Sequence, residues 1–118
     1  MFFRSGTIYK LDPSTGTETQ LYHFVGGNND GQSPNGSLLY EGGQLYGTTS
    51  TGGADDEFGT IFKVDANSGA ETVLYFFALD GEKDGGIPPC GLIRANGGYY
   101  GITSDLGKGA GTLFSFTP

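Results

Sequence analysis

The apolar residues of this chain fall into short runs that glycine, proline, asparagine and aspartate separate. Residues 6–12, Gly-Thr-Ile-Tyr-Lys-Leu-Asp, form the first run and stop at the turn-forming residues 13–16, Pro-Ser-Thr-Gly. Runs of β-branched and aromatic residues between such turn formers are typical of β-strands. No segment free of glycine shows the 3.6-residue apolar period of a helix. The pattern therefore predicts an all-β protein.

We expect nine strands, most of them joined in hairpins by short turns. The stretch 26–36 is rich in turn formers and is expected to be a loop, as is the Gly-Asp stretch 51–58. The expected strands are residues 6–12, 17–24, 38–41, 44–49, 59–65, 71–77, 92–94, 99–103 and 111–116.

One phrase of the sequence occurs three times. Gly6-Thr7-Ile8-Tyr9-Lys10 returns at 59–63 as Gly-Thr-Ile-Phe-Lys and at 111–115 as Gly-Thr-Leu-Phe-Ser, so the copies lie 53 and 52 residues apart. Length differences between the copies fall in turns, where insertions are tolerated. A fixed period of this size indicates a repeat architecture. We divide the chain into a first repeat with an N-terminal extension, a second repeat and the start of a third: residues 1–58, 59–110 and 111–118.

Four short strands in each repeat match the size of one β-propeller blade. The runs 59–65 and 71–77 are apolar on both alternating faces, as expected for strands that are covered from both sides. A β-solenoid would have a shorter period, and a β-sandwich need not repeat. The sequence predicts tandem four-stranded antiparallel units, about two propeller blades plus one extra strand.

Two blades do not close a ring, because units of this kind need about three or more to bury a continuous core. Either the chain is a piece of a longer propeller, or several copies assemble around an axis. In the second case the extra strand would complete a neighbour's blade by strand addition. The expected partners are therefore other copies of the chain or the missing blades.

Charge and composition exclude several partners. The formal charge is −7 and the six Lys and Arg residues are scattered, so we expect no nucleic acid, which needs a clustered basic surface. No stretch approaches the ~20 apolar residues of a membrane helix, so we expect no membrane insertion. Cys90 is the only cysteine. It is interpreted as a small, partly buried turn residue, with a reactive thiol as the alternative.

The densest set of carboxylates lies in a loop of the second repeat. Asp80, Glu82 and Asp84 alternate before Gly85, as ligands do in the first half of a calcium loop. The first repeat keeps one equivalent carboxylate, Asp30. We therefore expect no cofactor other than, in one reading, calcium. In the other reading Asp84 and Asp30 sit in solvated turns and bond their own backbone.

Two tyrosines at matching places are candidate ligand-binding residues. Tyr46 and Tyr100 each precede a glycine, and an aromatic face beside a small residue suits a sugar ring. The alternative is packing between blades. His23, the only histidine, is expected to pack in the core or at an edge. No catalytic residue is assigned, because a residue that every repeat needs is usually needed by the fold.

The order of these motifs resembles the GloVer tandem repeat of bacterial proteins. The resemblance is carried by Gly-Thr-Ile-Phe-Lys-Val-Asp, Leu-Tyr-Phe-Phe, Asp-Gly, Gly-Leu-Ile and Tyr-Gly-Ile-Thr-Ser, and it covers residues 6–118. It implies a propeller-like protein that is secreted or anchored at the cell surface.

With the scarcity of catalytic residue types, this indicates a non-enzymatic module that acts as scaffold or binding platform. A carbohydrate-binding lectin, formed by oligomerisation of two-blade chains, is the alternative. A propeller enzyme ranks third, because it would rest only on acidic loops such as 55–57.

Overall fold

The computed structural model describes residues 6–27, 29–53, 58–77, 88, 91–103 and 112–117. These residues form strands and turns and contain no helix, which confirms the all-β prediction. The strands are β1 (Thr7–Asp12), β2 (Thr17–His23), β3 (Gly31–Glu41), β4 (Gln44–Gly52), β5 (Thr60–Asp65), β6 (Glu71–Phe76), β7 (Ile93–Ala95), β8 (Gly98–Thr103) and β9 (Thr112–Phe116).

The strand β3 begins earlier than expected. Residues 31–36 were predicted to belong to a loop, and this was wrong, because Pro34 pairs with Thr49 within the β3–β4 ladder. Since β3 is an edge strand, a proline without an N–H group is tolerated there. The turn formers instead make the strand irregular: its register shifts between Asn35 and Leu39.

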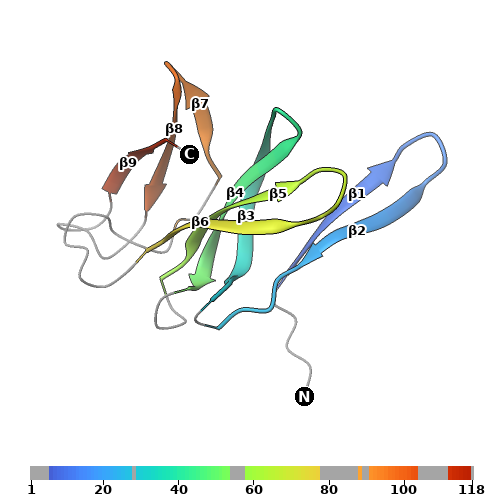
Figure 1. Ribbon diagram of the computed structural model, residues 1–118, viewed down its shortest axis with the longest axis horizontal. Helices are drawn as coiled ribbons and strands as arrows, with labels where there is room; N and C mark the ends of the chain where they lie inside the picture. Colours follow the sequence, from blue (N-terminus) through green and yellow to red (C-terminus); the bar gives the residue numbers. More distant parts are fainter. Residues whose placement is uncertain are drawn as a thin grey trace.

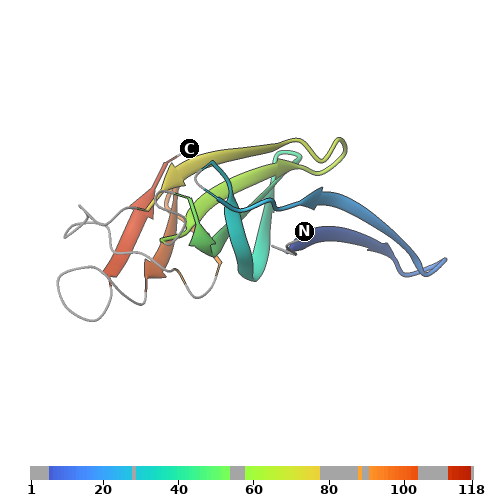
Figure 2. The same cartoon turned by 90° about the horizontal axis from the view of Figure 1, so that it is seen from below.

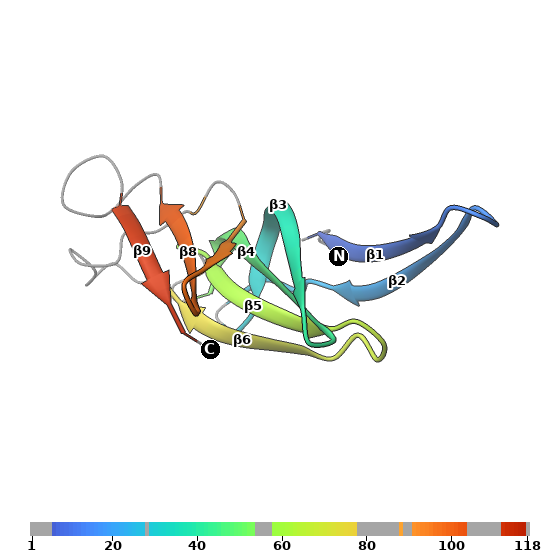
Figure 3. The ribbon, with the colours of Figure 1, turned by 90° about the horizontal axis from the view of Figure 1, so that it is seen from above.

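The strands form three antiparallel sheets, which we call the first sheet (β1–β2), the central sheet (β3–β4–β5–β6) and the third sheet (β7–β8–β9). They lie side by side in chain order and together measure 48 × 43 × 19 Å (Figure 1). Views from below and from above place the first and third sheets on opposite sides of the central one (Figure 2, Figure 3).

The predicted four-stranded antiparallel unit is present, but it does not coincide with a sequence repeat. The central sheet joins β3 and β4 of the first repeat to β5 and β6 of the second. The first sheet holds only strands of the β5 and β6 type. The third sheet holds strands of the β3, β4 and β5 type. The sheets are therefore offset from the sequence repeats by two strands.

Two apolar clusters hold the three sheets together. The cluster between the first and central sheets contains Ile8, Phe24, Phe62 and Val64, with Leu21, Tyr22 and Leu45 packed against it. The cluster between the central and third sheets contains Tyr46, Phe58, Ile61, Phe77, Leu92 and Tyr99, with Leu39, Leu74, Phe114 and Phe116 packed against it.

The strand β5 supplies both clusters. Ile61 is 1% exposed and belongs to the cluster with the third sheet, whereas Phe62 and Val64 are fully buried in the cluster with the first sheet. Successive side chains of a strand point to opposite faces. The burial of residues 59–65 from both sides, expected from their apolar pattern, is thus confirmed. The same expectation for residues 71–77 is wrong for β6, an edge strand whose Tyr75 and Phe76 are 37% and 38% exposed.

Candidate functional site

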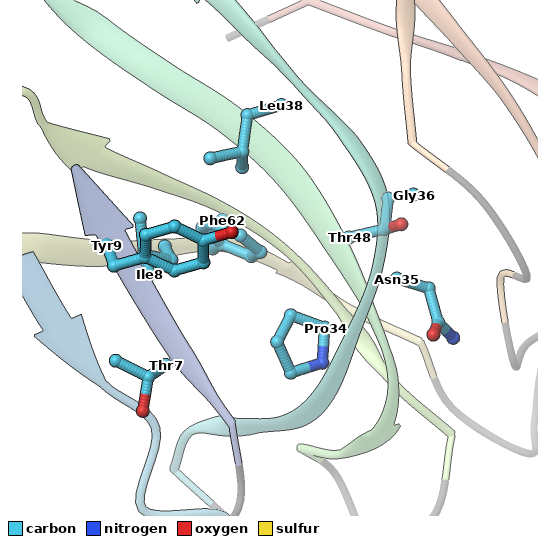
Figure 4. A pocket seen from close by; sticks show the side chains of 9 residues that line it. All are labelled: Thr7, Ile8, Tyr9, Pro34, Asn35, Gly36, Leu38, Thr48 and Phe62. Atoms are coloured by element: carbon cyan, nitrogen blue, oxygen red, sulfur yellow. The ribbon is translucent and has the colours of Figure 1, made fainter. Parts of the chain in front are cut away.

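A cleft of about 380 Å³ opens between the first and central sheets. Figure 4 shows its lining side chains, which come from β1, β3, β4 and β5. They are Thr7, Ile8, Tyr9, Pro34, Asn35, Gly36, Leu38, Thr48 and Phe62.

The irregular part of β3 forms one wall of the cleft. Ser33 and Gly36 have positive φ values of 57° and 76°, and the backbone between them carries Pro34 and Asn35 past β1. The ring of Pro34 packs so closely on Gly6 that a Cβ there would overlap it. Since Gly6 also has a φ of 109°, only glycine fits at this contact.

None of the described residues that line the cleft has a charged side chain. The hydroxyl of Thr7 lies 3.1 Å from Nδ1 of His23, an exposed residue at the end of β2. The amide of Asn35 adds a donor and an acceptor, and the ring of Tyr9 is 60% exposed. Apolar and aromatic walls with a few polar groups suit a small uncharged ligand.

The two predicted ligand-binding tyrosines do not share a site. Tyr46 is 8% exposed, and its ring stacks on that of Tyr99 with centroids 4.8 Å apart. Because the ring is enclosed between two sheets, it packs in the core and has no open face for a sugar. Tyr100 lies elsewhere, half-buried in a shallow hollow of about 180 Å³ that Ile93, Ile102 and Leu113 also line.

The predicted calcium ligands Asp80, Glu82 and Asp84 lie outside the described residues, as do Cys90 and the acidic stretch 55–57. Within the residues that the structure does describe, no three metal-ligating side chains come together. The calcium loop stays a prediction.

Asp30 does not sit in a solvated turn, as one reading expected. It is 3% exposed and accepts hydrogen bonds from the backbone N–H groups of Val25 and Gly31, at 2.9 and 2.8 Å. Bonding to the local backbone was foreseen, but burial was not. Tyr22 of β2 reaches the turn, and Asp30 accepts a bond of 2.8 Å from its hydroxyl.

A second carboxyl group lies beside this network. Burial, together with the neighbouring Asp30, raises the pKa of Glu71 to about 8. Burial also raises the pKa of Tyr22, with the bond to Asp30 as the next cause. One oxygen of Glu71 is buried without a hydrogen-bond partner. The first and central sheets therefore meet at a polar junction that contains two carboxyl groups and a tyrosine hydroxyl.

The central and third sheets meet at a different polar junction. Glu41, at the end of β3, accepts a 2.6 Å hydrogen bond from the hydroxyl of Tyr99 and a 2.7 Å bond from Nε of Arg94. The hydrogen bonds from Tyr99 and Arg94 lower the pKa of Glu41, and the bond from Tyr99 has the larger effect. The Arg94 guanidinium lies 5.1 Å from the centroid of the Tyr99 ring. The group links three strands of two sheets.

Sequence reasoning did not predict the cleft. In the sequence, Asn35 does not stand out from the turn-forming residues around it, and Tyr9 does not stand out from the apolar residues of its strand. A comparison of repeats offers one sign: Tyr9 has a hydroxyl where the second and third copies have Phe62 and Phe114.

Antiparallel sheets that follow one another in chain order with repeated registers define an all-β tandem-repeat protein. The family model described as the Gloeobacter/Verrucomicrobia repeat matches residues 3–118, so the chain belongs to this repeat family. No curated protein matches the chain, and no solved structure matches it. In the part of the chain that the structure describes, no helix has the length and apolarity to cross a membrane.

Proposed function

We propose that the chain is a non-enzymatic β-propeller module, secreted or held at the cell surface, that acts as a scaffold or binding platform within a larger ring. The proposed location rests on the family resemblance.

The succession of three sheets through similar contacts carries this proposal. In the central sheet Gly47 of β4 pairs with Phe62 of β5, and in the third sheet Gly101 of β8 pairs with Phe114 of β9. The sheets thus share the same internal pairing, and they pack on one another through apolar clusters on their faces. A structure of this kind can continue in both directions and is suited to ring closure.

The shifted pKa values also support a structural role. Perturbed carboxyl groups mark catalytic sites in many proteins, but ion-pair and hydrogen-bond networks perturb them too. Here Glu41 bonds Arg94 and Tyr99 of the neighbouring sheet, and Glu71 lies at the junction with Tyr22. Neither carboxyl group lines the cleft.

The proposal is tested by screening the intact protein for binding and for turnover on the same set of soluble glycans and peptides. We expect saturable binding without turnover. Reproducible hydrolysis or elimination, lost on substitution of a carboxylate, would overturn the non-enzymatic assignment.

The second candidate is a carbohydrate-binding lectin formed by oligomerisation, and the cleft favours it. Its lining combines the rings of Pro34 and Phe62, the amide of Asn35 and, among the described residues, no charge. Asn35→Ala should abolish glycan-array binding, whereas Tyr40→Ala, which removes a 65% exposed tyrosine outside the cleft, should leave it intact. A folded oligomer that binds no glycan would contradict this candidate.

A further inference from the structure

The repeated strand occurs in three different settings. Within the described residues, β5 has a neighbour on both edges, β4 and β6, whereas β1 pairs only with β2 and β9 pairs only with β8. The central sheet therefore shows which contacts such a strand makes when it is complete. The two end sheets can be compared with it residue by residue.

The face of β1 that points away from the central sheet is apolar and open. Tyr9 is 60% exposed and Leu11 is 56% exposed, whereas the equivalent residues of β5, Phe62 and Val64, are fully buried. The first sheet covers those two residues of β5. Within the described residues, no equivalent sheet covers the outer face of β1.

The third sheet has the opposite face open. Leu113 is 73% exposed and Ile102 is 45% exposed, whereas their equivalents in the central sheet, Ile61 and Thr48, are each 1% exposed. The third sheet covers Ile61. The two open faces are thus the two complementary sides of one kind of sheet-to-sheet contact.

The cleft shows a related difference. Leu38 is 40% exposed at the cleft, whereas its repeat equivalent Leu92 is 6% exposed in the cluster with Tyr46. Tyr46 lies on β4, and the first sheet holds no strand of the β4 type. The partly open Leu38 therefore faces a place where no such strand lies among the described residues.

The edge of β8 is built to receive this strand in one register. Phe114 lies over Gly101, where a Cβ would come within 2.5 Å of its ring, and Phe62 lies over Gly47, where the corresponding distance is 2.8 Å. An aromatic ring that covers a cross-strand glycine helps to fix the register. In β1 the ring at the equivalent place belongs to Tyr9.

We propose that the β1–β2 hairpin of a second copy of the chain replaces β9 on the edge of β8. The resulting sheet has the order β7–β8–β1–β2 and reproduces the central sheet. Its register follows from that of β9, in which Thr103 pairs with Thr112 and Tyr100 with Ser115. Thr7 then pairs with Thr103, Tyr9 with Gly101, and Lys10 with Tyr100.

This arrangement covers both open faces at once. Tyr9 and Leu11 enter the cluster in which Phe114 and Phe116 now pack against the central sheet of the first copy. Tyr100 and Ile102 come to lie against the central sheet of the second copy, near its Leu38. The exchange keeps a strand on β8 and adds β2 as a fourth strand, so assembly gains contacts that β9 alone does not provide.

A second copy fits better than an unrelated strand. The strand β1 matches β5 at Ile8 and Lys10, where β9 has Leu113 and Ser115. In the central sheet the equivalent lysine, Lys63, pairs with Tyr46, so Lys10 has a matching place beside Tyr100. Because the contact joins different ends of two copies, it is head-to-tail and closes a ring when the rotation permits.

The inference rests on the proposed ring and names its partner, and disulfide trapping tests it. In a Cys90→Ser background, Lys10→Cys and Tyr100→Cys proteins are prepared separately, mixed in equal amounts and oxidised. Antiparallel partners lie about 4.5–5.5 Å apart at Cα, within reach of a disulfide. Random pairing of reactive thiols would make roughly one half of the disulfide-linked dimers mixed. We expect a share well above this, because two Lys10→Cys chains, or two Tyr100→Cys chains, do not bring their cysteines together.

The matched control replaces Tyr100→Cys by Ile102→Cys, which is exposed on the same strand and two residues out of register. A mixed disulfide that forms equally well with this control, or only at the random share, overturns the inference. A ring made with missing blades of a longer chain would survive that result, as would ligand binding by the cleft, so the failures can be told apart.

Light scattering on the full chain supplies a readout without added cysteines. Leu113→Pro removes a backbone donor from β9 and should strengthen self-association, because the competing strand is weakened. Tyr9→Lys should weaken self-association by at least roughly tenfold, equivalent to about 1.4 kcal/mol. If the unmodified chain and its Leu113→Pro variant both stay monomeric up to millimolar concentration, the inference is overturned.

Discussion

The hydroxyl of Tyr99 on β8 donates a 2.6 Å hydrogen bond to Glu41 on β3. The two residues are 58 positions apart and belong to different sheets. The ring of Tyr99 is 2% exposed and stacks on Tyr46, while Arg94 pairs with the other oxygen of Glu41. One residue thus combines an apolar contact with a polar one at the junction of the central and third sheets.

Removal of the Tyr99 ring should destabilise the protein far more than removal of its hydroxyl. Tyr99→Ala should lower the free energy of unfolding by about 3–5 kcal/mol, as for other buried aromatic residues. Tyr99→Phe should lower it by only about 0.5–1.5 kcal/mol, because Glu41 is 45% exposed and water replaces the lost bond. Denaturant unfolding measures both. Tyr40→Ala, at a 65% exposed site, should change the value by less than about 0.5 kcal/mol.

A methyl group at Gly47 should strain the central sheet. A Cβ there would come within 2.8 Å of the Phe62 ring and 2.9 Å of Leu38, and overpacking of this kind costs about 1–3 kcal/mol. Gly98→Ala is the matched control, because the nearest atom to its Cβ is 3.7 Å away. Equal unfolding midpoints for the two variants would contradict the close contact of Gly47 and Phe62.

The two buried threonines that pair between β4 and β5 should contribute unequally to the free energy of unfolding. The Thr49 hydroxyl oxygen accepts a 3.0 Å bond from the backbone N–H of Thr60 and lies 2.8 Å from the Thr60 hydroxyl. Thr49→Val leaves that buried N–H without its acceptor, which costs about 1–3 kcal/mol. Thr60→Val removes only the hydroxyl pair and should cost less. Thermal unfolding of both variants gives the order, and the reverse order would refute this account.

Glu71 should make stability depend on pH. Its pKa is raised from 4.5 to about 8 in the folded protein, so the folded state holds its proton more tightly than the unfolded state does. The contribution is present below pH 4.5 and is lost as the pH rises from there through about 8. Because Glu71 is only partly buried, solvent screens part of the shift and the effect should be on the order of 1 kcal/mol.

Glu71→Gln should remove this dependence and make the protein more stable than the wild type at pH 8. Glu18→Gln is the matched control, because Glu18 is the equivalent residue of the first repeat and is exposed. Unfolding measured from pH 5 to pH 9 distinguishes the two variants. Identical pH profiles for wild type and Glu71→Gln would contradict the assigned role.

The candidate site was predictable only in part. Tyr46 and Tyr100 hold the same place in the repeat, but Tyr46 is enclosed by the third sheet, whereas no sheet covers Tyr100 within the described residues. Ligand binding by Tyr100 stays a prediction. The cleft joins residues of β1 to residues of β3–β5. Such a site depends on how two sheets cross, which no local pattern specifies.

The sequence by itself determined the strands, the turns and the repeat. Consecutive apolar residues such as Ile61 and Phe62 require a strand that is buried on both sides. Glycine and proline mark many strand ends, although Pro34 lies within β3 and Gly47 within β4. These are local properties of backbone and side chains.

Only the tertiary structure decided which strands share a sheet. The repeat begins at Gly6 and Gly59, whereas the central sheet begins at Gly31. The grouping of strands into sheets is decided by pairing between the two repeats, in which Gly47 leaves room for Phe62. It is also decided by the burial of the two faces of β5 against different sheets. Packing energy of this kind depends on residues brought together from separate repeats.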